Sequence, residues 1–121
     1  MREIKFRAWD EEIKCMVKVD SMHFPLGKPN KKDISVFNEE EFYYEWVHDY
    51  ELMQCTGIKD KNGKEIYEGD IVCYKYNGEL IKVMVEFVNG TYFAGDAFLY
   101  NKRNVAKIIG NIYENPKLLE K

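Results

Sequence analysis

The two histidines are the first side chains in this 121-residue chain to weigh as metal ligands. His23 lies beside Phe24 and Pro25 with no other ligand nearby, and His48 lies next to Asp49. A metal site needs further ligands at suitable spacing. Adjacent residues on a regular element point in different directions, so His48 and Asp49 do not form an oriented pair. Structural or solvated roles are therefore predicted for both histidines, and we expect neither a metal nor a cofactor.

Carboxylates are the second group with candidate chemistry, and a block without any Lys or Arg comprises Glu39, Glu40, Glu41, Glu45, Asp49 and Glu51. Paired carboxylates can hydrolyse glycosides or hold metals. No second carboxylate motif accompanies the block, so we interpret it as a solvated acidic face. The stretch from Asp60 to Glu68 faintly resembles a calcium loop, but it lacks the terminal glutamate at the required offset. A hairpin turn is the better interpretation of that stretch.

Cysteine usage and missing motifs bear on compartment and catalysis. Cys15, Cys55 and Cys73 are widely spaced, and their odd number without a C-x-x-C pair argues against disulfides or a zinc knuckle. Charges interrupt the segment from Met1 to Arg7, which leaves no apolar signal-peptide core. The sequence contains no run of about 18 apolar residues, so no membrane span is expected. A P-loop, nucleophile elbow, H-E-x-x-H motif and dinucleotide fingerprint are all missing. We expect a cytoplasmic protein that is not an enzyme.

Aromatic side chains interleave with the acidic block, and together they form the candidate protein-binding site, Phe42, Tyr43, Tyr44, Trp46 and Tyr50. Aromatic residues dominate interface hot spots, and a chain this short cannot easily bury an aromatic content of 15%. The alternative is that these rings cap one open end of a barrel. Asn38 followed by Glu41 resembles a helix capping box, whereas the aromatic residues favour a strand. A short helix or an irregular segment is the preferred prediction for residues 38–49.

Net charge separates two classes of partner. The chain has 18 basic and 21 acidic residues and a net charge of -3, so it has no general bias toward duplex DNA. A local site remains the alternative, because small barrels bind single strands through aromatic stacking in a basic groove. That reading would use exposed aromatics with Lys28, Lys31, Lys32, Lys102 and Arg103. The residues from Asn101 to Asn104 are expected to form a basic loop.

Alternating hydrophobicity and turn residues predict a mostly β chain. Apolar and charged residues alternate at the start of residues 4–9, and residues 14–19 are largely apolar. A polar turn separates the two segments, which indicates a β-hairpin. Asn-Gly pairs at 62–63, 77–78 and 89–90 are separated by strand-length runs, which predicts an antiparallel meander. Residues 25–33 are predicted to form a loop, and residues 34–37 a short strand. Gly110 suggests a bulge in the last apolar stretch, and Pro116 after Asn115 favours a closing helical turn.

Three stretches together resemble a known family. They are EIKFRAW at residues 3–9, QCTGIKDKNGKEIYEGDIV at residues 54–72 and IGNIYENP at residues 109–116. The chain resembles the YopX family of phage and prophage proteins across nearly its whole length. The resemblance implies a small SH3-like β-barrel preceded by a short N-terminal α+β or hairpin region, and a gene carried by a phage or prophage. It supplies no activity, catalytic residue or binding residue.

These observations combine into one expectation of organisation and function. Residues 1–50 are predicted to form an N-terminal β-hairpin with an irregular or helical region, and residues 51–121 the SH3-like barrel. Because its turn residues lie between strand-forming residues, the segment from Thr56 to Val72 is predicted to be scaffold, with Asp70 bonding to neighbouring backbone N–H groups. We expect a non-catalytic protein-binding or assembly module in the bacterial cytoplasm. Its partner would be another protein or a second copy of the chain, and nucleic acid is the alternative.

Overall fold

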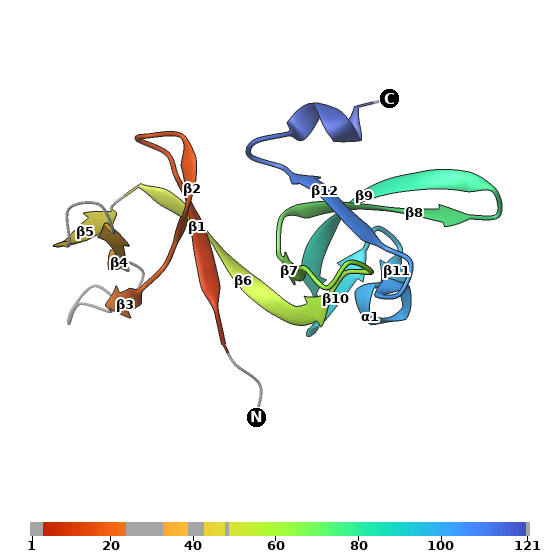
Figure 1. The fold of residues 1–121 in the computed structure, drawn as a ribbon, viewed down its shortest axis with the longest axis horizontal. Helices are drawn as coiled ribbons and strands as arrows, with labels where there is room; N and C mark the ends of the chain where they lie inside the picture. The colour runs from red at the N-terminus through yellow and green to blue at the C-terminus, as the bar shows by residue number, and fades with distance from the viewer. Residues whose placement is uncertain (1–3, 24–32, 39–42, 48, 121) are drawn as a thin grey trace. The chain divides into compact units, whose positions relative to one another are not determined.

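A computed structural model describes residues 4–23, 33–38, 43–47 and 49–120 of the chain (Figure 1). The protein is mostly β, as expected, with three antiparallel sheets whose strand orders are β2-β1-β6-β7, β3-β4-β5 and β11-β10-β9-β8-β12. The chain divides into two compact units. The N-terminal unit is Lys5–Leu52, and the C-terminal unit is Met53–Lys121 with Met1–Ile4.

The expected N-terminal hairpin is confirmed. Strand β1 (Phe6–Asp10) pairs antiparallel with β2 (Cys15–Lys18), in register from Arg7 opposite Lys18 to Asp10 opposite Cys15. Burial does not alternate along β1, because Ala8, Trp9 and Asp10 are all buried. Ala8 is completely buried and belongs to the apolar core of the unit, with Val17 of β2 packed against it. The hairpin therefore supplies one wall of the N-terminal core.

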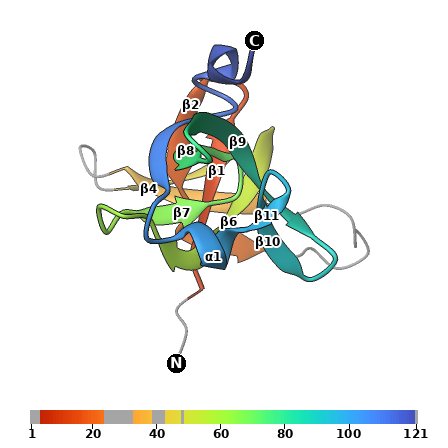
Figure 2. The same ribbon diagram turned by 90° about the vertical axis from the view of Figure 1, so that its right-hand side faces the viewer.

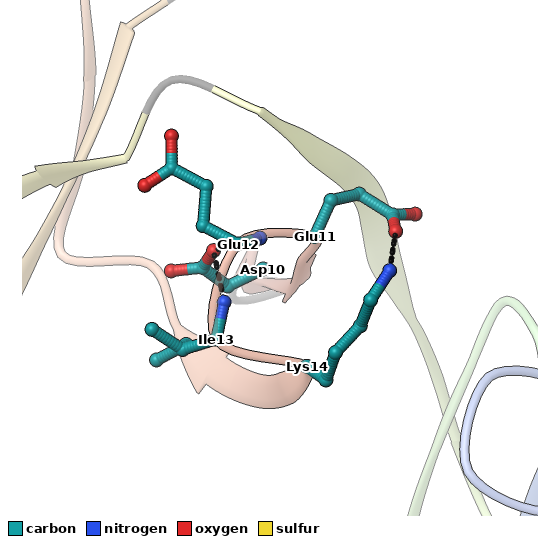
Figure 3. A network of polar contacts seen from close by, with 5 residues as sticks. All are labelled: Asp10, Glu11, Glu12, Ile13 and Lys14. Atoms are coloured by element: carbon teal, nitrogen blue, oxygen red, sulfur yellow. Dashed lines mark hydrogen bonds and ion pairs between the residues drawn. The ribbon is translucent and has the colours of Figure 1, made fainter.

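Local side-chain bonds close the turn between these strands (Figure 3). Asp10 Oδ1 accepts hydrogen bonds from the backbone N–H of Glu12 at 3.0 Å and of Ile13 at 3.4 Å. Lys14 adopts a positive φ of 54° and donates to Glu11 Oε2 at 2.9 Å. A short acidic side chain that bonds to the backbone two residues later is a common way to fix such a turn.

A three-stranded sheet completes the N-terminal unit. It consists of β3 (Ser21–His23), β4 (Asp33–Asn38) and β5 (Tyr43–Val47). Ile34 on β4 pairs with Val47 on β5, and both side chains are buried together with Ala8. The short strand expected at residues 34–37 is thus confirmed. The loop expected from Pro25 to Asp33 falls, except for Asp33 in β4, outside the described residues.

The helix or irregular segment preferred for residues 38–49 is wrong where the structure describes it. Residues 43–47 form strand β5, and their backbone pairs with β4 from Ile34–Val47 to Asn38–Tyr43. Aromatic and β-branched residues favour strands because they suit a half-buried pleated surface. In this segment the backbone pairs with β4, and Val47 packs in the apolar core. The acidic start of the supposed helix, residues 39–42, lies outside the described part of the chain.

The C-terminal unit begins within the long strand β6 (Tyr50–Lys59), whose first residues belong to the N-terminal unit. Its later part pairs with β7 (Glu65–Tyr67), with Cys55 opposite Tyr67 and Lys59 opposite Glu65. The turn between β6 and β7 contains the first Asn-Gly pair, and only Gly63 of that pair has a positive φ, 82°. The side chain of Asp60, rather than a two-residue hairpin turn, therefore organises this loop.

The five-stranded sheet of this unit curls into a half-barrel (Figures 1 and 2). Its strands are β8 (Asp70–Tyr76), β9 (Glu79–Val88), β10 (Thr91–Ala94), β11 (Ala97–Phe98) and β12 (Lys107–Asn111). Residues 79–84 of β9 pair with β8, whereas residues 85–88 pair with β10. Because one strand changes partner midway, the sheet bends around its concave face.

Two of the three Asn-Gly pairs make the tight turns that the sequence predicts. Asn77 and Gly78 have φ of 50° and 80°, and Asn89 and Gly90 have φ of 49° and 86°. Two successive positive φ angles match the twist of the flanking antiparallel strands. These turns connect β8 to β9 and β9 to β10, which confirms the predicted antiparallel meander in this part of the chain.

The core of the C-terminal unit lies on the concave face of the half-barrel. Its buried members are Ile66, Val72, Tyr74, Val85, Tyr92, Ala94, Leu99 and Ala106. Leu99 begins α1 (Leu99–Lys102), the one α-helix among the described residues, and is fully buried. The basic loop expected at residues 101–104 is thus partly wrong, because burial of Leu99 holds the first two of these residues in helical conformation.

The C-terminal segment matches two expectations. The register of β12 against β8 shifts between Ile108 and Gly110, which confirms the predicted bulge. A helical turn, η1 (Pro116–Leu119), follows as expected, in 3-10 form. Asn115 does not cap it; Asn115 Oδ1 instead accepts a bond from the backbone N–H of Asn111 at 3.2 Å. A Cβ at Gly110 would lie 2.5 Å from Asn115 Oδ1, so only glycine leaves room for this bond.

Candidate binding groove

The aromatic segment singled out by the sequence is only partly visible. Trp46 on β5 is 55% exposed, whereas Tyr50 is half-buried and packs against the N-terminal core. Phe42 lies outside the described residues, and the side chains of Tyr43 and Tyr44 are likewise not described. Of this proposed site, the described side chains therefore give one exposed ring and one that belongs mainly to the core.

A second surface, in the C-terminal unit, was not identified as a site from the sequence. A groove of about 440 Å³ is lined by Tyr74, Tyr76, Ile81, Val83, Gly95, Asp96, Ala97 and Lys102. Tyr74 pairs with Ile81 across β8 and β9. Alternation puts Tyr74 and Tyr76 on the same face of β8, and the face that is buried at Tyr74 becomes 56% exposed at Tyr76.

Lys102 forms one side of the groove and covers both tyrosine rings. Its Nζ lies 4.9 Å from the ring centre of Tyr74 and 4.8 Å from that of Tyr76. Leu99 anchors the preceding turn of α1 in the core, and residues three apart lie on the same side of a helix. An ammonium within about 6 Å of an aromatic face is attracted by the ring quadrupole. The groove therefore already holds a cation over its aromatic wall.

The turn between β10 and β11 also lines the groove. Gly95 has a positive φ of 66°, and a Cβ at this position would lie 2.7 Å from Val83 Cγ1. The turn therefore packs directly against β9, and only glycine permits this approach. The next residue, Asp96, is exposed and contributes the one carboxylate among the groove-lining residues. Aromatic, aliphatic and acidic groups thus face the same space.

Tyr74 stays neutral in this setting. Burial raises the pKa of its phenol above the ordinary value of 10.0, and the negative charge of Asp96 raises it further. The hydroxyl donates to the carbonyl oxygen of Ala94 over a long distance of 3.4 Å. The ring consequently provides an uncharged aromatic face to a ligand at any ordinary pH.

A separate hollow carries basic residues. It has a volume of about 390 Å³ and is lined by Lys61, Cys73, Tyr74, Lys75, Leu80, Asn104, Val105 and Lys107. Of the basic residues proposed for nucleic-acid binding, Lys28, Lys31 and Lys32 lie outside the described residues. Lys102 lines the groove instead, and Arg103 stacks on Tyr100 with Cζ 3.7 Å from the ring centre.

The long motif at residues 54–72 builds structure through its own polar side chains. Thr56 Oγ1 donates to the carbonyl of Ile66 at 2.8 Å and accepts from the N–H of Ile58 at 3.1 Å. Gln54 and Glu68 exchange two bonds, one from each backbone N–H, at 2.9 Å and 3.0 Å. These bonds join β6 to the turn after β7, which agrees with a scaffold role.

Asp60 joins the first turn of this motif to β12. Its Oδ1 accepts from the N–H groups of Asn62 and Lys64, each at 2.9 Å, and its Oδ2 accepts from the N–H of Ile108 at 3.0 Å. Burial alone would raise the pKa of this carboxyl, but the three N–H groups and the charge of Lys64 outweigh it and hold the pKa below its ordinary value of 3.8. Asp60 is therefore ionised at neutral pH, although its side chain is buried.

Gly69 and Asp70 form the second turn of the motif. Asp70 Oδ2 accepts from the N–H of Tyr67 at 2.8 Å, as the sequence predicts. Gly69 has a positive φ of 83°, donates its N–H to Val85 and accepts from the N–H of Ile112, both at 3.0 Å. The turn thus holds β7, β9 and the C-terminal segment together, and its backbone atoms are already engaged within the chain.

Within the described residues, no group of three or more His, Cys, Asp and Glu side chains is placed to hold a metal ion. Over that same part of the chain, no helix is both long and apolar enough to cross a membrane. The three cysteines, all of them described, form no disulfide.

Comparison with known proteins identifies the family. A family model described as YopX protein matches residues 5–120. The chain belongs to the YopX family. The resemblance carried by the three sequence motifs is thereby confirmed. In this YopX protein the first motif contributes most of strand β1, the second contains the turns around β7, and the third contains the bulge of β12. No protein with a curated description matches the chain.

A solved structure supports the same fold. The crystal structure of protein EF1440 from Enterococcus faecalis is similar to this chain, with a TM-score of 0.70 and 30% sequence identity. The match covers 99% of this chain and 100% of that chain. The similarity therefore extends over both units of the YopX protein.

Proposed function

We propose that this YopX protein is a non-catalytic binding module of a phage or prophage, and that its C-terminal unit holds a protein partner in the groove. The half-barrel that buries its core on the concave face supports a finer description of this unit as an SH3-like barrel. The partner is another protein or a second copy of the chain, met in the cytoplasm of the bacterial host.

One observation carries the proposal: the groove continues the apolar core out to the surface. Tyr74 is 7% exposed and Tyr76 is 56% exposed, so the same strand face passes from core to solvent between these residues. Ile81 and Val83 provide aliphatic floor beside them. Binding hot spots are enriched in tyrosine and sit in concave pockets that exclude water, and a groove of this composition suits an apolar protein segment.

Trp46 marks a second contact region on the N-terminal unit. It is 55% exposed on β5, next to the buried Val47. We retain the segment Phe42–Tyr50 as a proposed protein-binding region on this ground. The groove is the stronger candidate, because several described side chains from β8, β9 and α1 converge there.

Selection of displayed peptides on the immobilised full chain tests the proposal. Peptides that bind the wild-type chain are expected to lose binding to the Tyr76→Ala variant. Tyr100→Ala is the matched control. Tyr100 lies on α1 and is 58% exposed, much like Tyr76, but it does not line the groove. Equal binding to wild-type, Tyr76→Ala and Tyr100→Ala chains, all shown to be folded, would refute the groove as the binding site. Light scattering across a concentration series identifies a partner that is a second copy.

Single-stranded nucleic acid is the second candidate, favoured by the three lysines that line the basic hollow. Residues 53–121 hold ten Lys and Arg against nine Asp and Glu, whereas residues 5–52 hold seven against eleven, so the C-terminal unit is the less acidic part. Anisotropy of a labelled oligothymidine at two salt concentrations tests this function. Binding that weakens with salt and is lost in Lys75→Ala with Lys107→Ala would establish it, because the salt dependence counts displaced counterions.

A further inference from the structure

The ammonium of Lys102 shows what the aromatic wall of the groove accepts. It lies within 5 Å of two ring centres, at 4.9 Å from Tyr74 and 4.8 Å from Tyr76, although it is free to extend into water on a flexible stem. Lysine is strongly hydrated and its side chain loses entropy when held. Its position over both rings therefore indicates a favourable cation site.

We propose, on the basis of the groove function above, that the protein partner inserts a lysine or arginine side chain over Tyr74 and Tyr76, and that Lys102 is a built-in competitor which this side chain displaces. Binding then exchanges one cation for another on the same rings. Lys102 would keep the rings covered in the unbound chain and would weaken any ligand that lacks a cation.

The charge of Asp96 in the groove argues for a basic rather than an acidic occupant. Asp96 is exposed and lines the groove, and no Lys or Arg of the described residues forms an ion pair with it. Once Lys102 swings away, the groove presents one carboxylate and two aromatic faces, and all three attract cations. An acidic occupant would instead meet Asp96 and need Lys102 to stay in place.

The two arrangements predict opposite effects of removing Lys102. If Lys102 competes with the partner's cation, then Lys102→Met frees the rings and strengthens binding. If Lys102 attracts an acidic partner, the same substitution weakens binding. The energy range of cation–π contacts corresponds to a gain of about threefold to thirtyfold in affinity for the competing arrangement.

An NMR titration of the isotope-labelled full chain tests the inference with defined probes. The probes are N-acetyl-lysine amide, N-acetyl-norleucine amide and N-acetyl-glutamate amide, and the signals are the backbone amides of Gly95, Asp96 and Ala97. We expect the lysine probe to shift these signals most, to bind Lys102→Met about threefold or more tightly, and to bind Asp96→Asn more weakly. Lys82→Met, an exposed lysine on β9 that does not line the groove, is the matched control and should bind like the wild type.

Each outcome decides between the claims. No shift from the lysine probe, an equal response to norleucine, or unchanged or weaker binding to Lys102→Met would overturn the inference. If peptides selected on the wild-type chain bind the groove equally well when their basic residues are replaced by norleucine, only this inference fails. If selected peptides also bind the Tyr76→Ala variant as tightly as the wild type, the proposed function fails together with this inference.

Discussion

Replacing Asp60 removes a side chain that links the first turn of the family motif to β12. Its carboxylate accepts three backbone N–H groups, of which only that of Ile108 lies outside the turn, 48 residues away in sequence. A hydrogen bond to a buried charged group contributes about 2 kcal/mol, and the two turn bonds, whose donors water can reach, contribute about 0.5 kcal/mol each. Asp60→Ala should therefore destabilise the C-terminal unit by about 3 kcal/mol, or about 12 °C or more in Tm.

The assay has to report on the C-terminal unit itself. Both tryptophans, Trp9 and Trp46, lie in the N-terminal unit, so tryptophan fluorescence would follow the other unit. Native-state hydrogen exchange at the amides of Val72 and Val85 measures opening of the C-terminal core. Glu86→Gln, which changes an exposed carboxylate of the same unit, is the control and should leave exchange unchanged.

Acid provides a second test of the same bonds. The folded pKa of Asp60 lies below 3.8, so its contribution is present above about pH 4 and is lost as the pH falls through the folded pKa. Asp60→Asn cannot titrate, and should be about 2 kcal/mol less stable at pH 7 because one acceptor and the charge are lost. The difference between the two chains should shrink as the pH falls below about 4. Equal stability at pH 7, or a difference that stays the same as the pH falls through the acid range, would refute the assigned role.

Three further predictions follow from the backbone at glycines, and one binding prediction follows from the net charge of -3. Gly90→Ala, at a φ of 86° with nothing within 4 Å of the new Cβ, should cost about 1 kcal/mol in thermal unfolding from backbone strain alone. Gly69→Val should cost about 2 kcal/mol or more, since its Cβ would meet Met53 Sδ at 3.2 Å, and an unchanged Tm would contradict the scaffold role. Gly95→Ala should cost more than Gly90→Ala by the same measurement, because the new Cβ would clash with Val83. Filter binding with duplex DNA at moderate salt should show weak or no association, and sub-micromolar affinity that falls steeply with salt would contradict it.

Local signals predicted much of the fold. The Asn-Gly pairs at residues 77–78 and 89–90 require successive positive φ angles and mark their turns directly. Segment 43–47 was missed, because a capping box and an acidic run suggest a helix when the partner strand β4 is not known. Tertiary pairing decides such a segment, since strand preference depends on what the side chains pack against.

The groove could be predicted only in fragments. Alternation places Tyr74 and Tyr76 on one face of a strand, and Lys102 stands out as a basic residue. No local pattern reports that the turn at Gly95 and Asp96 comes to face those rings, because a chain must curl before residues about 20 apart in sequence enclose one space. The long-range hydrogen bond from the Ile108 N–H to Asp60 could not be predicted from the sequence for the same reason.

Site-specific photocrosslinking in bacterial cells that produce the protein tests the central claim most directly. A photoreactive phenylalanine analogue replaces Tyr76 in the groove, Tyr100 outside it, or Trp46 on the N-terminal unit, and crosslinked proteins are identified by mass spectrometry. We predict a discrete crosslinked protein, or a crosslinked second copy of the chain, from position 76 and none from position 100. Crosslinks from position 46 or 100 with none from position 76 would contradict the assignment of the groove as the binding site.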